Sequence, residues 1–484
     1  MKKRLQTLAG KERLLWLSAT AGLFVVLLVT LVPVTVAAQS QTSQDERLLN
    51  MFERVYDFVR QNYVEEVDPE VLMEGALDGM FQSLEDPHSA YLTAEEMRDL
   101  RDTTRGQFGG VGMYIAKQGE DESEDEDGED GGFVEVVAPI EDTPAFRSGI
   151  MAGDLIVEIE GESTRPLDID QVVNRLRGEP GTTVEVLIRR GTSHNLTVEL
   201  TRAIIEVPTV KHAMIDDEIA FLRIIQFTPY TDQRVEESLR EFAEEGYESL
   251  IIDLRQNPGG LLSGVVDTAD LFFEDGTIVG TRGRKASENE VFQADPGTSV
   301  PEDIPIVVLI DEGSASAAEI MAGALKDRDR AYLIGETTYG KGSVQEVHVV
   351  GTGGFRLTMS KYYTPDGTYI EDNGIEPDEV VKPPELSDAE VESLTRITDE
   401  QLVTSFVDEH PEPSESEIES FINDLREQDI QLSERRIRKM VRDEVNRRNN
   451  VSPAYDLEFD VMLQEAVRLL QENRISAKGT MTGN

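Results

Sequence analysis

Hydrophobic and polar positions follow two different periods along the chain. Between 105 and 205 the short segments FVEVV, LIVEIEG, TVEVLIRR and LTVEL alternate at every second residue, and glycine-containing turns separate them. This alternation is typical of half-buried β-strands. One segment in this range, DIDQVVNRLRG, has helical spacing instead. The pattern predicts a small β-rich domain with a helix.

Apolar runs of strand length alternate with helical patterns between 206 and 384. We expect strands in AFLRIIQF, SLIIDL, PIVVLI and AYLIG, and helices in TDQRVEESLREFAEEG, GLLSGVVDTADLFF and SAAEIMAGALKD. Strands that are apolar throughout, each followed by an amphipathic helix, indicate a largely parallel sheet covered by helices. The chain is therefore predicted to be a multidomain α/β protein in which 206–384 is the candidate catalytic core.

Helical patterns flank these two regions. Residues 41–104 carry apolar side chains near helical spacing, beginning at Leu48, with a break at Asp86-Pro87. In the extension 385–484 we expect three amphipathic helices. The first is opened by a capping box, in which Ser414 is followed three residues later by Glu417.

The first 40 residues combine a basic start, MKKRLQTLAGKER, with an uncharged stretch over 14–38. Two interpretations remain open. The stretch is an uncleaved membrane anchor, or it is a signal peptide cleaved after the small residues at 36–38. Its length favours the anchor, because a spanning helix needs about 20 apolar residues and a signal core is shorter. Either way, the remainder is expected outside the cytoplasm, in a periplasm or on the outer face of the cytoplasmic membrane.

Composition excludes several classes of function. The chain has 95 acidic and 46 basic residues and a formal net charge of -49. Such an excess of negative charge argues against nucleic-acid binding through a basic surface. There is no cysteine, which excludes disulfides and thiolate ligands, and the five histidines are scattered without a zinc-binding spacing. We expect no metal and no cofactor.

Two charged runs admit a functional and a structural interpretation. The acidic run EDESEDEDGED lies within 119–131, and it is interpreted as a solvated loop between strands because the ligand spacing of a calcium loop is absent. The arginine-rich run over 435–448 resembles a nucleic-acid patch. On so acidic a chain we interpret it as a helix face paired with carboxylates.

Two serines stand where a strand gives way to a helix, in PIVVLIDEGSASAAEI. Catalytic groups of open α/β sheets gather at the carboxyl ends of strands. One serine, Ser314, is expected to cap the helix, which leaves Ser316 for chemistry. Downstream, Lys341 lies between glycines in YGKGSVQ, where burial would lower the pKa of its amine so that the neutral form acts as a base. A serine–lysine pair needs no histidine.

The same lysine admits a nucleotide-binding interpretation. GETTYGKG, residues 335–342, differs by one residue from the phosphate-binding loop GxxxxGK[ST]. However, Gly342 replaces the hydroxyl that would bind magnesium, and the following SVQEVHVV alternates like a strand. A phosphate loop must open a helix instead. Both features that a phosphate-binding loop requires are missing, which argues against the nucleotide-binding interpretation.

Together these motifs resemble the carboxyl-terminal processing serine proteases, over roughly 50–384. The resemblance implies a protease core of the ClpP/crotonase-like type with an inserted PDZ domain. In GSASAAEI it makes Ser316 the nucleophile, and in YGKGSVQ it makes Lys341 the general base and Gln345 the residue that orients the lysine. DLRQNPGG resembles the oxyanion segment, and Asp327 matches an acidic position of some members. The implied oxyanion donors are the backbone amides of Ala317 and of either Gly259 or Gly260.

The β-rich domain, 105–205, resembles a PDZ domain in the order of its motifs. Its glycine-rich loop would bind a terminal carboxylate through backbone N–H groups while the peptide adds as a strand. The peptide-binding residues implied by the resemblance are Gly110, Val111, Gly112 and Met113. The family also suggests that this domain gates the protease, with Arg177 as the substrate sensor.

The sequence therefore predicts a serine endopeptidase that recognises substrate C-termini through its PDZ domain. Its expected partners are proteins with free C-termini, the membrane if the segment 1–40 stays uncleaved, and a second copy of the chain through the helical regions. The alternative from another class is a non-catalytic PDZ scaffold that binds exported C-termini.

Overall fold

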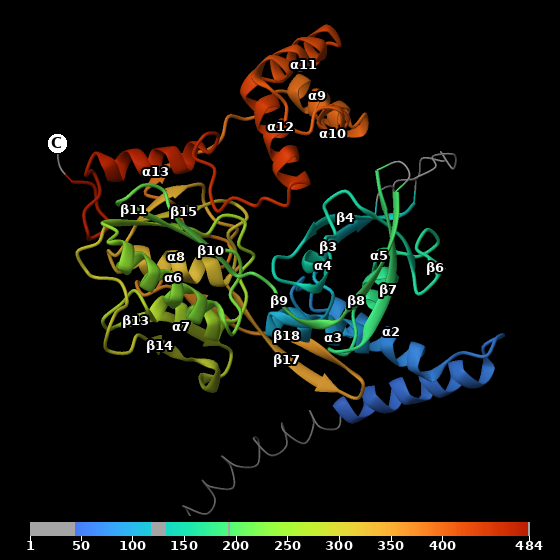
Figure 1. Ribbon diagram of the computed structural model, residues 1–484. Coiled ribbons are helices and arrows are strands. Elements are labelled where there is room, and N and C mark those ends of the chain that lie inside the picture. The colour runs from blue at the N-terminus through green and yellow to red at the C-terminus, as the bar shows by residue number, and fades with distance from the viewer. Residues whose placement is uncertain (1–43, 118–131, 192–193, 483–484) are drawn as a thin grey trace, which may run out of the picture. The chain divides into compact units, whose positions relative to one another are not determined.

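The computed structural model describes residues 44–117, 132–191 and 194–482, and Figure 1 shows their helices and strands. They form two compact units, which divide between Tyr91 and Leu92. The predicted signal or anchor at 1–40 and the acidic run within 119–131 lie outside the described residues. None of the described helices is both long and apolar enough to cross a membrane.

The first unit is helical, as predicted. One helix covers 44–62, and α2 (Pro69–Gln82) follows it. Asp68 caps α2 by accepting the N–H of Glu70 at 2.8 Å, and Pro69 occupies the first turn, where its missing N–H leaves no bond unmade. Local capping chemistry therefore defines where this helix begins.

The second unit begins with α3 and contains the predicted β-rich region. The alternating apolar residues of β4 and β7 form one buried core, which includes Val134, Val136, Val184 and Val186. The strands of this region are β2 (Gln107–Gly110), β3 (Met113–Lys117), β4 (Val134–Pro139), β5 (Leu155–Ile159), β6 (Glu162–Ser163), β7 (Thr183–Arg190), β8 (His194–Thr201) and β9 (Ala203–Glu206). The helices are α3 (Ala94–Arg105), α4 (Pro144–Arg147) and α5 (Ile169–Leu176).

A six-stranded sheet forms the centre of the 206–384 region, in the order β10-β11-β12-β15-β16-β19. All neighbouring pairs are parallel except β10 with β11, which confirms the α/β prediction. Its strands are β10 (Val210–Met214), β11 (Ile219–Ile224), β12 (Ser249–Asp253), β15 (Ile306–Ile310), β16 (Tyr332–Gly335) and β19 (Glu379–Val380), and its helices are α6 (Thr231–Glu245), α7 (Leu262–Asp270) and α8 (Ala317–Asp327).

Successive residues of the central strands pack into two different cores, because side chains of a strand alternate between its faces. In β15, Ile306 and Val308 belong to a core shared with α6, α7 and α8, whereas Val307 and Leu309 pack against α13 (Val461–Gln471). Figure 1 shows α13 on the opposite side of the sheet from those three helices. The strands are apolar throughout because both faces are covered.

Four more strands, β13, β14, β17 and β18, pair with one another in antiparallel fashion. β18 pairs with β17 and with β13, and β13 pairs with β14. The bounds are β13 (Thr277–Gly283), β14 (Val291–Gln293), β17 (Ser343–Val350) and β18 (Gly353–Tyr363), and a short 3-10 helix, η1, covers Ala286–Glu288. The segment SVQEVHVV is thus a strand, as its alternation predicted, and the residues directly after Lys341 lead into this strand and not into a helix.

The C-terminal extension contains more helices than the three predicted. Besides α11 (Glu415–Glu427), α12 (Glu434–Arg448) and α13, two short helices precede Ser414: α9 (Asp388–Asp399) and α10 (Leu402–Glu409). Both are held by a core shared with α11 and α12. The helix α9 was missed in the sequence, although Ser387 and Glu390 open it with the same kind of capping box as α11. The capping box is confirmed, because Glu417 accepts the backbone N–H of Ser414 at 2.7 Å.

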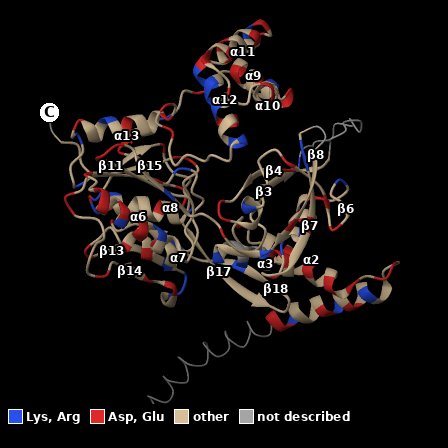
Figure 2. Ribbon diagram, viewed as in Figure 1, with Lys and Arg blue, Asp and Glu red and all other residues tan. Residues whose placement is uncertain are grey.

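The basic run is the salt-bridged helix face that we expected. Figure 2 shows lysine and arginine along α12. Arg438 contacts Glu434 at 2.9 Å, and Arg448 contacts Glu444 at 2.8 Å. Four arginines of this helix are therefore engaged by carboxylates of the chain itself: Arg438, Arg442, Arg447 and Arg448.

Candidate active site

Ser316 lies at the sharp turn between β15 and α8. It is the N-cap of α8 without a side-chain capping hydrogen bond, and its backbone has φ 55° and ψ -113°. This conformation is unfavourable for a residue with a side chain, costs on the order of 1–3 kcal/mol, and is concentrated at functional sites. The same geometry holds the serine of a nucleophile elbow. The strained turn agrees with the prediction that Ser316 is a functional residue, and its role stays a prediction.

Ser314 does not cap α8, and that part of the sequence interpretation is wrong. Its side chain is fully buried, donates to the carbonyl oxygen of Leu254 at 2.9 Å and accepts the N–H of Asp311 at 3.0 Å. The cap position belongs to Ser316 because the helix starts two residues later than a Ser314 cap requires. Through these two hydrogen bonds, Ser314 connects the turn after β15 to Leu254, which follows β12.

A buried carboxylate, Glu319, joins the serine turn to the lysine turn. One of its oxygens accepts the backbone N–H groups of Ser316 at 2.7 Å and of Lys341 at 2.8 Å. The other oxygen accepts Thr338 Oγ1 at 2.6 Å and the N–H of Gly340 at 2.7 Å. Burial raises the pKa of Glu319, while these four donors favour the charged carboxylate and oppose the rise. The backbones of the two predicted catalytic residues therefore lie within two hydrogen-bond lengths of each other.

Lys341 has the environment of a general base. Burial lowers the pKa of its amine from 10.5, and the positive charge of Arg356 lowers it further, while Glu371 and Glu319 act in the opposite sense. The net shift is downward, which increases the neutral fraction near physiological pH. Only that fraction can accept a proton from a serine hydroxyl.

The side chains of the predicted pair are not hydrogen-bonded to each other. Among the described residues, no hydrogen bond joins Ser316 to Lys341. Gln345 donates to Ser343 Oγ at 2.9 Å and, at 3.4 Å, to Thr358 Oγ1, so its amide does not orient the lysine here. The roles of Ser316, Lys341 and Gln345 thus remain predictions, and active-site hydrogen bonds that are long in a free enzyme often form only with substrate.

The predicted oxyanion segment lies directly against the serine turn. A Cβ atom added to Gly259 would be 2.8 Å from Ser316 Cβ and 2.9 Å from the nitrogen of Ala317, so only glycine fits there. The N–H of Gly259 donates to Asn257 Oδ1 at 2.8 Å. In the described part of the chain, the N–H groups of Gly260 and Ala317 have no acceptor. The structure therefore leaves Gly260 and Ala317 as the available pair of donors.

Asp327 is too distant from Ser316 for a direct role. It ends α8, whose 11 residues separate the two by about 16 Å at 1.5 Å per residue. Its carboxylate accepts the N–H of Asp366 at 3.0 Å. Glu319 is the acidic residue that contacts both the Ser316 turn and the Lys341 turn. The spacing Ser-x-x-Glu, which also describes a capping box, was the signal for it in the sequence.

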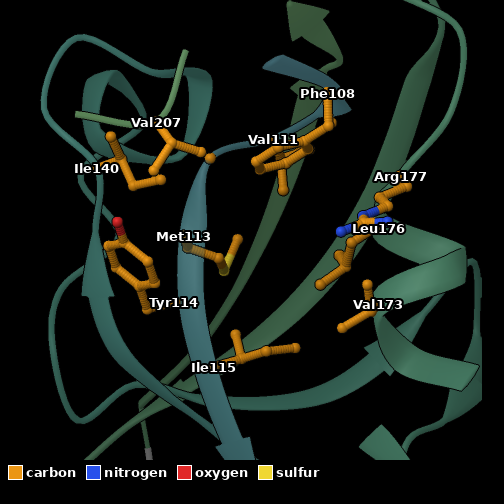
Figure 3. Close-up of a pocket in the computed structure, with 12 residues that line it drawn as sticks. Phe108, Val111, Met113, Tyr114, Ile115, Ile140, Val173, Leu176, Arg177 and Val207 are labelled. Atoms are coloured by element: carbon orange, nitrogen blue, oxygen red, sulfur yellow. The ribbon is translucent and has the colours of Figure 1, made fainter. Parts of the chain in front are cut away.

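The residues predicted to bind peptide line an apolar groove of about 270 Å³ (Figure 3). Gly110, Val111, Gly112 and Met113 form one end of it, at the junction of β2 and β3. Gly112 has φ +80°, and among the described residues the N–H groups of Val111 and Gly112 donate to no acceptor. Two free donors beside an apolar groove suit a terminal carboxylate followed by an apolar side chain.

Arg177, the predicted sensor, lies at the rim of this groove. It follows α5, and its guanidinium carbon is 5.1 Å from the centre of the Phe108 ring. Figure 3 shows Arg177 beside Leu176 and Val173, on the side of the groove formed by α5. This position suits contact with a bound peptide, whereas its predicted contact with the core stays a prediction.

Within the described ranges, no three histidine, aspartate or glutamate side chains are grouped so that they could hold a metal ion. The site as described offers a hydroxyl, an amine with a lowered pKa and backbone donors. These groups are sufficient for acyl transfer through a serine nucleophile.

Three protein-family models match the chain. Residues 218–381 match peptidase family S41, residues 135–190 match the PDZ domain, and residues 29–96 match the activating protease CtpB N-terminal domain. The S41 match contains the turns of Ser316 and Lys341.

Curated relatives are similar over most of the chain. A carboxy-terminal-processing protease of Bartonella bacilliformis is 40% identical over 359 residues, which cover 72% of this chain and 79% of the relative. The carboxy-terminal processing protease CtpA of Bacillus subtilis is 32% identical over 71% of each chain. Among solved structures, the photosystem II D1 C-terminal processing protease is 28% identical, with a TM-score of 0.42 over 70% of this chain and 88% of that one.

Proposed function

This chain belongs to the carboxy-terminal processing serine proteases of peptidase family S41, and we propose that it uses Ser316 and Lys341 as a catalytic dyad outside the cytoplasm. We further propose that its PDZ domain selects substrates by their free C-termini. Membership of a peptidase family disfavours the alternative of a non-catalytic scaffold.

The proposed reaction is acyl transfer through a serine ester. Neutral Lys341 takes the hydroxyl proton of Ser316, and the serine oxygen attacks the substrate carbonyl carbon. The amides of Ala317 and Gly260 donate to the resulting oxyanion. Protonated Lys341 then returns the proton to the leaving amine, and water hydrolyses the acyl-enzyme with Lys341 again as base.

The observation that carries this proposal is the shared carboxylate of Glu319. Because it accepts N–H groups from both turns, Ser316 and Lys341 are held together although 24 residues separate them. The hydroxyl and the amine are not bonded in the described state, so the proposal requires the Lys341 side chain to turn toward Ser316 when substrate binds.

Selection by the C-terminus rests on the groove between β3 and α5. A free carboxylate would accept the N–H groups of Val111 and Gly112, and the last side chain would enter the apolar groove beside Met113. An amidated terminus lacks the negative charge that these donors favour. The extracytoplasmic location rests on the basic and apolar start of the sequence.

The dyad is tested with Ser316→Ala and Lys341→Arg, assayed on fluorescent casein and by labelling with a fluorophosphonate. Both variants should lose at least 99% of casein cleavage, because alanine has no nucleophile and arginine stays protonated. Lys326→Arg is the matched control, since Lys326 is a lysine of the same core paired with Asp378. Substantial cleavage by a correctly folded Ser316→Ala enzyme would exclude Ser316 as the nucleophile.

A further inference from the structure

Arg255 is shared between two carboxylates at the edge of the central sheet. Its Nε and Nη2 donate to the two oxygens of Asp253 at 2.9 and 2.8 Å, and its Nη1 and Nη2 donate to the two oxygens of Asp460 at 2.9 and 2.6 Å. The exposed fractions of the three side chains are 16% for Arg255, 1% for Asp253 and 18% for Asp460. Both contacts are bidentate, the geometry that gives arginine–carboxylate pairs their strength and their fixed orientation.

Arg255 is part of the segment that leads from β12 to the predicted oxyanion glycines. The next residue, Gln256, donates its N–H to Asp311 at 2.9 Å. Asn257 is fully buried, and its carbonyl oxygen accepts the N–H of Ala315 while its side chain accepts the N–H of Gly259. The position of Arg255 therefore influences the position of the backbone at Gly259, which lies against Ser316.

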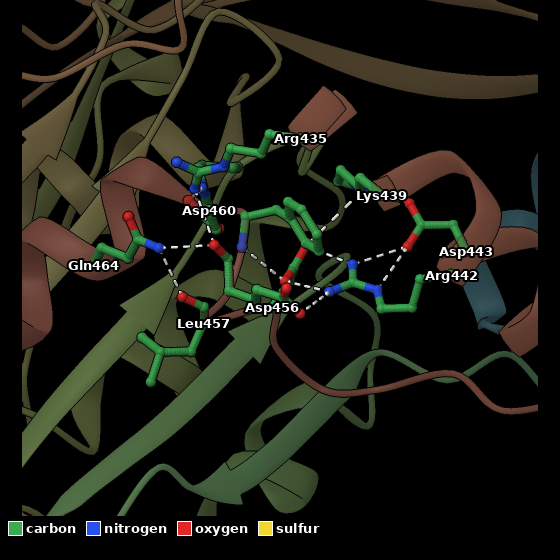
Figure 4. Close-up of polar contacts among 11 residues, drawn as sticks. Arg435, Lys439, Arg442, Asp443, Asp456, Leu457, Asp460 and Gln464 are labelled. Carbon is green, nitrogen blue, oxygen red and sulfur yellow. Dashed lines mark hydrogen bonds and ion pairs between the residues drawn. The ribbon is translucent and has the colours of Figure 1, made fainter. Parts of the chain in front are cut away.

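Asp460 belongs to the C-terminal extension. It caps α13 by accepting the N–H of Leu463 at 3.0 Å, and α13 is anchored on the central sheet by apolar residues that include Met462 and Leu469. Figure 4 shows Asp460 together with Asp456, which pairs with Arg442 of α12. Asp460 is therefore a fixed point, held by the helix that it caps and by the buried face of that helix.

We propose that Asp460 is a positioning residue for catalysis, through which the C-terminal extension holds the oxyanion segment by the guanidinium of Arg255. The inference rests on the proposed function of Ser316 and gives a role to the extension. Asp253 and Arg255 are two residues apart, so their contact alone stays within one segment. The bond to Asp460 connects that segment to a different element.

This role predicts an effect on kcat rather than on KM. Oxyanion donors act on the charge that develops in the transition state, and a shift of about 1 Å in such groups can reduce the rate by about a hundredfold. The groove that would hold the substrate's C-terminus contains neither Arg255 nor Asp460. Substrate binding there should be unaffected by the loss of their contact.

The test uses the full chain with Asp460→Asn and Arg255→Lys. Asparagine is as good a helix cap as aspartate but loses the charge, and lysine cannot bond two carboxylates in bidentate fashion. The matched control is Asp456→Asn, which breaks the pair with Arg442 in the same extension without touching residues 253–260. We measure kcat and KM on a peptide with a free apolar C-terminus, and the melting temperature of each variant.

The expected result is a tenfold or greater fall in kcat for Asp460→Asn, with KM within about twofold and the control close to wild type. Arg255→Lys should behave similarly, although it also disrupts the contact with Asp253. The double variant should be no slower than the slower single variant, because both changes disrupt the contact between Arg255 and Asp460. An unchanged kcat would overturn the proposal. The proposal would also be overturned if kcat fell in the control Asp456→Asn as well, and if the fall in each variant simply followed its loss of melting temperature.

Failure of this inference is distinguishable from failure of the proposed dyad. If Ser316→Ala is inactive while Asp460→Asn matches the control, the dyad stands and the positioning role falls. If Ser316→Ala keeps its activity, both fall. If the Asp460→Asn protein does not fold, Arg255→Lys decides alone, because it leaves the cap of α13 intact.

Discussion

Replacing Glu319 with glutamine tests the link between the two catalytic turns. The carboxylate accepts two donors at each oxygen, with all four distances between 2.6 and 2.8 Å. Glutamine keeps one oxygen, and its amide nitrogen would face two of the donors. Two hydrogen bonds are therefore lost, and two donors are left without an acceptor in a fully buried place.

The loss of stability can be estimated from the two donors that are left without an acceptor. Each buried group left unsatisfied costs about 1–3 kcal/mol, so the variant should lose about 2–6 kcal/mol of unfolding free energy. For a domain of this size that corresponds to a melting temperature roughly 5–20 °C lower. Casein cleavage at a temperature where the variant remains folded should fall at least tenfold, because two of the four hydrogen bonds that position the serine and lysine turns are lost.

The assay combines thermal unfolding with casein cleavage, and Glu312→Gln is the matched control. Glu312 is an exposed carboxylate four residues before Ser316, so its replacement removes the same charge without removing a buried acceptor. The control should remain within about 1 °C and twofold of wild type. A Glu319→Gln enzyme with the stability and activity of the control would refute the reasoning from shared hydrogen bonds.

The remaining predictions concern the base and the PDZ groove. Arg356→Gln removes a positive charge that lowers the pKa of Lys341, so the pH at which activity is half-maximal should rise. Glu371→Gln removes a charge that raises this pKa, so the same midpoint should fall, and equal midpoints in both variants would argue against Lys341 as the base. In Gly112→Asp the new Cβ would lie 2.3 Å from Thr143 Cβ at a φ of +80°, and the added charge would repel a carboxylate. This variant should cleave substrates with free and amidated C-termini at equal rates, and a retained preference in a paired competition assay would place recognition elsewhere.

Periodicity in the sequence was sufficient to predict most of the fold. The central strands are apolar at every position because helices cover both faces of the sheet, whereas the PDZ-like strands alternate around a single core. The places of Ser316 and Lys341 could also be predicted, because carboxyl ends of parallel strands meet at one edge of a sheet. The helices α9 and α10 were missed, although α9 opens with a capping box, Ser387 and Glu390, like the one that marked α11.

Only the tertiary structure decided which groups meet at the site. No local sequence pattern predicts the hydrogen bond from the N–H of Lys341 to Glu319. The same is true of the contact between Arg255 and Asp460, which are 205 residues apart. Conversely, helix length removes Asp327 from the site although the family pattern suggested it. The physical reason is that hydrophobic periodicity and helix capping depend only on residues that are a few positions apart in the sequence. Hydrogen bonds among buried groups depend instead on how distant segments pack, which no local pattern encodes.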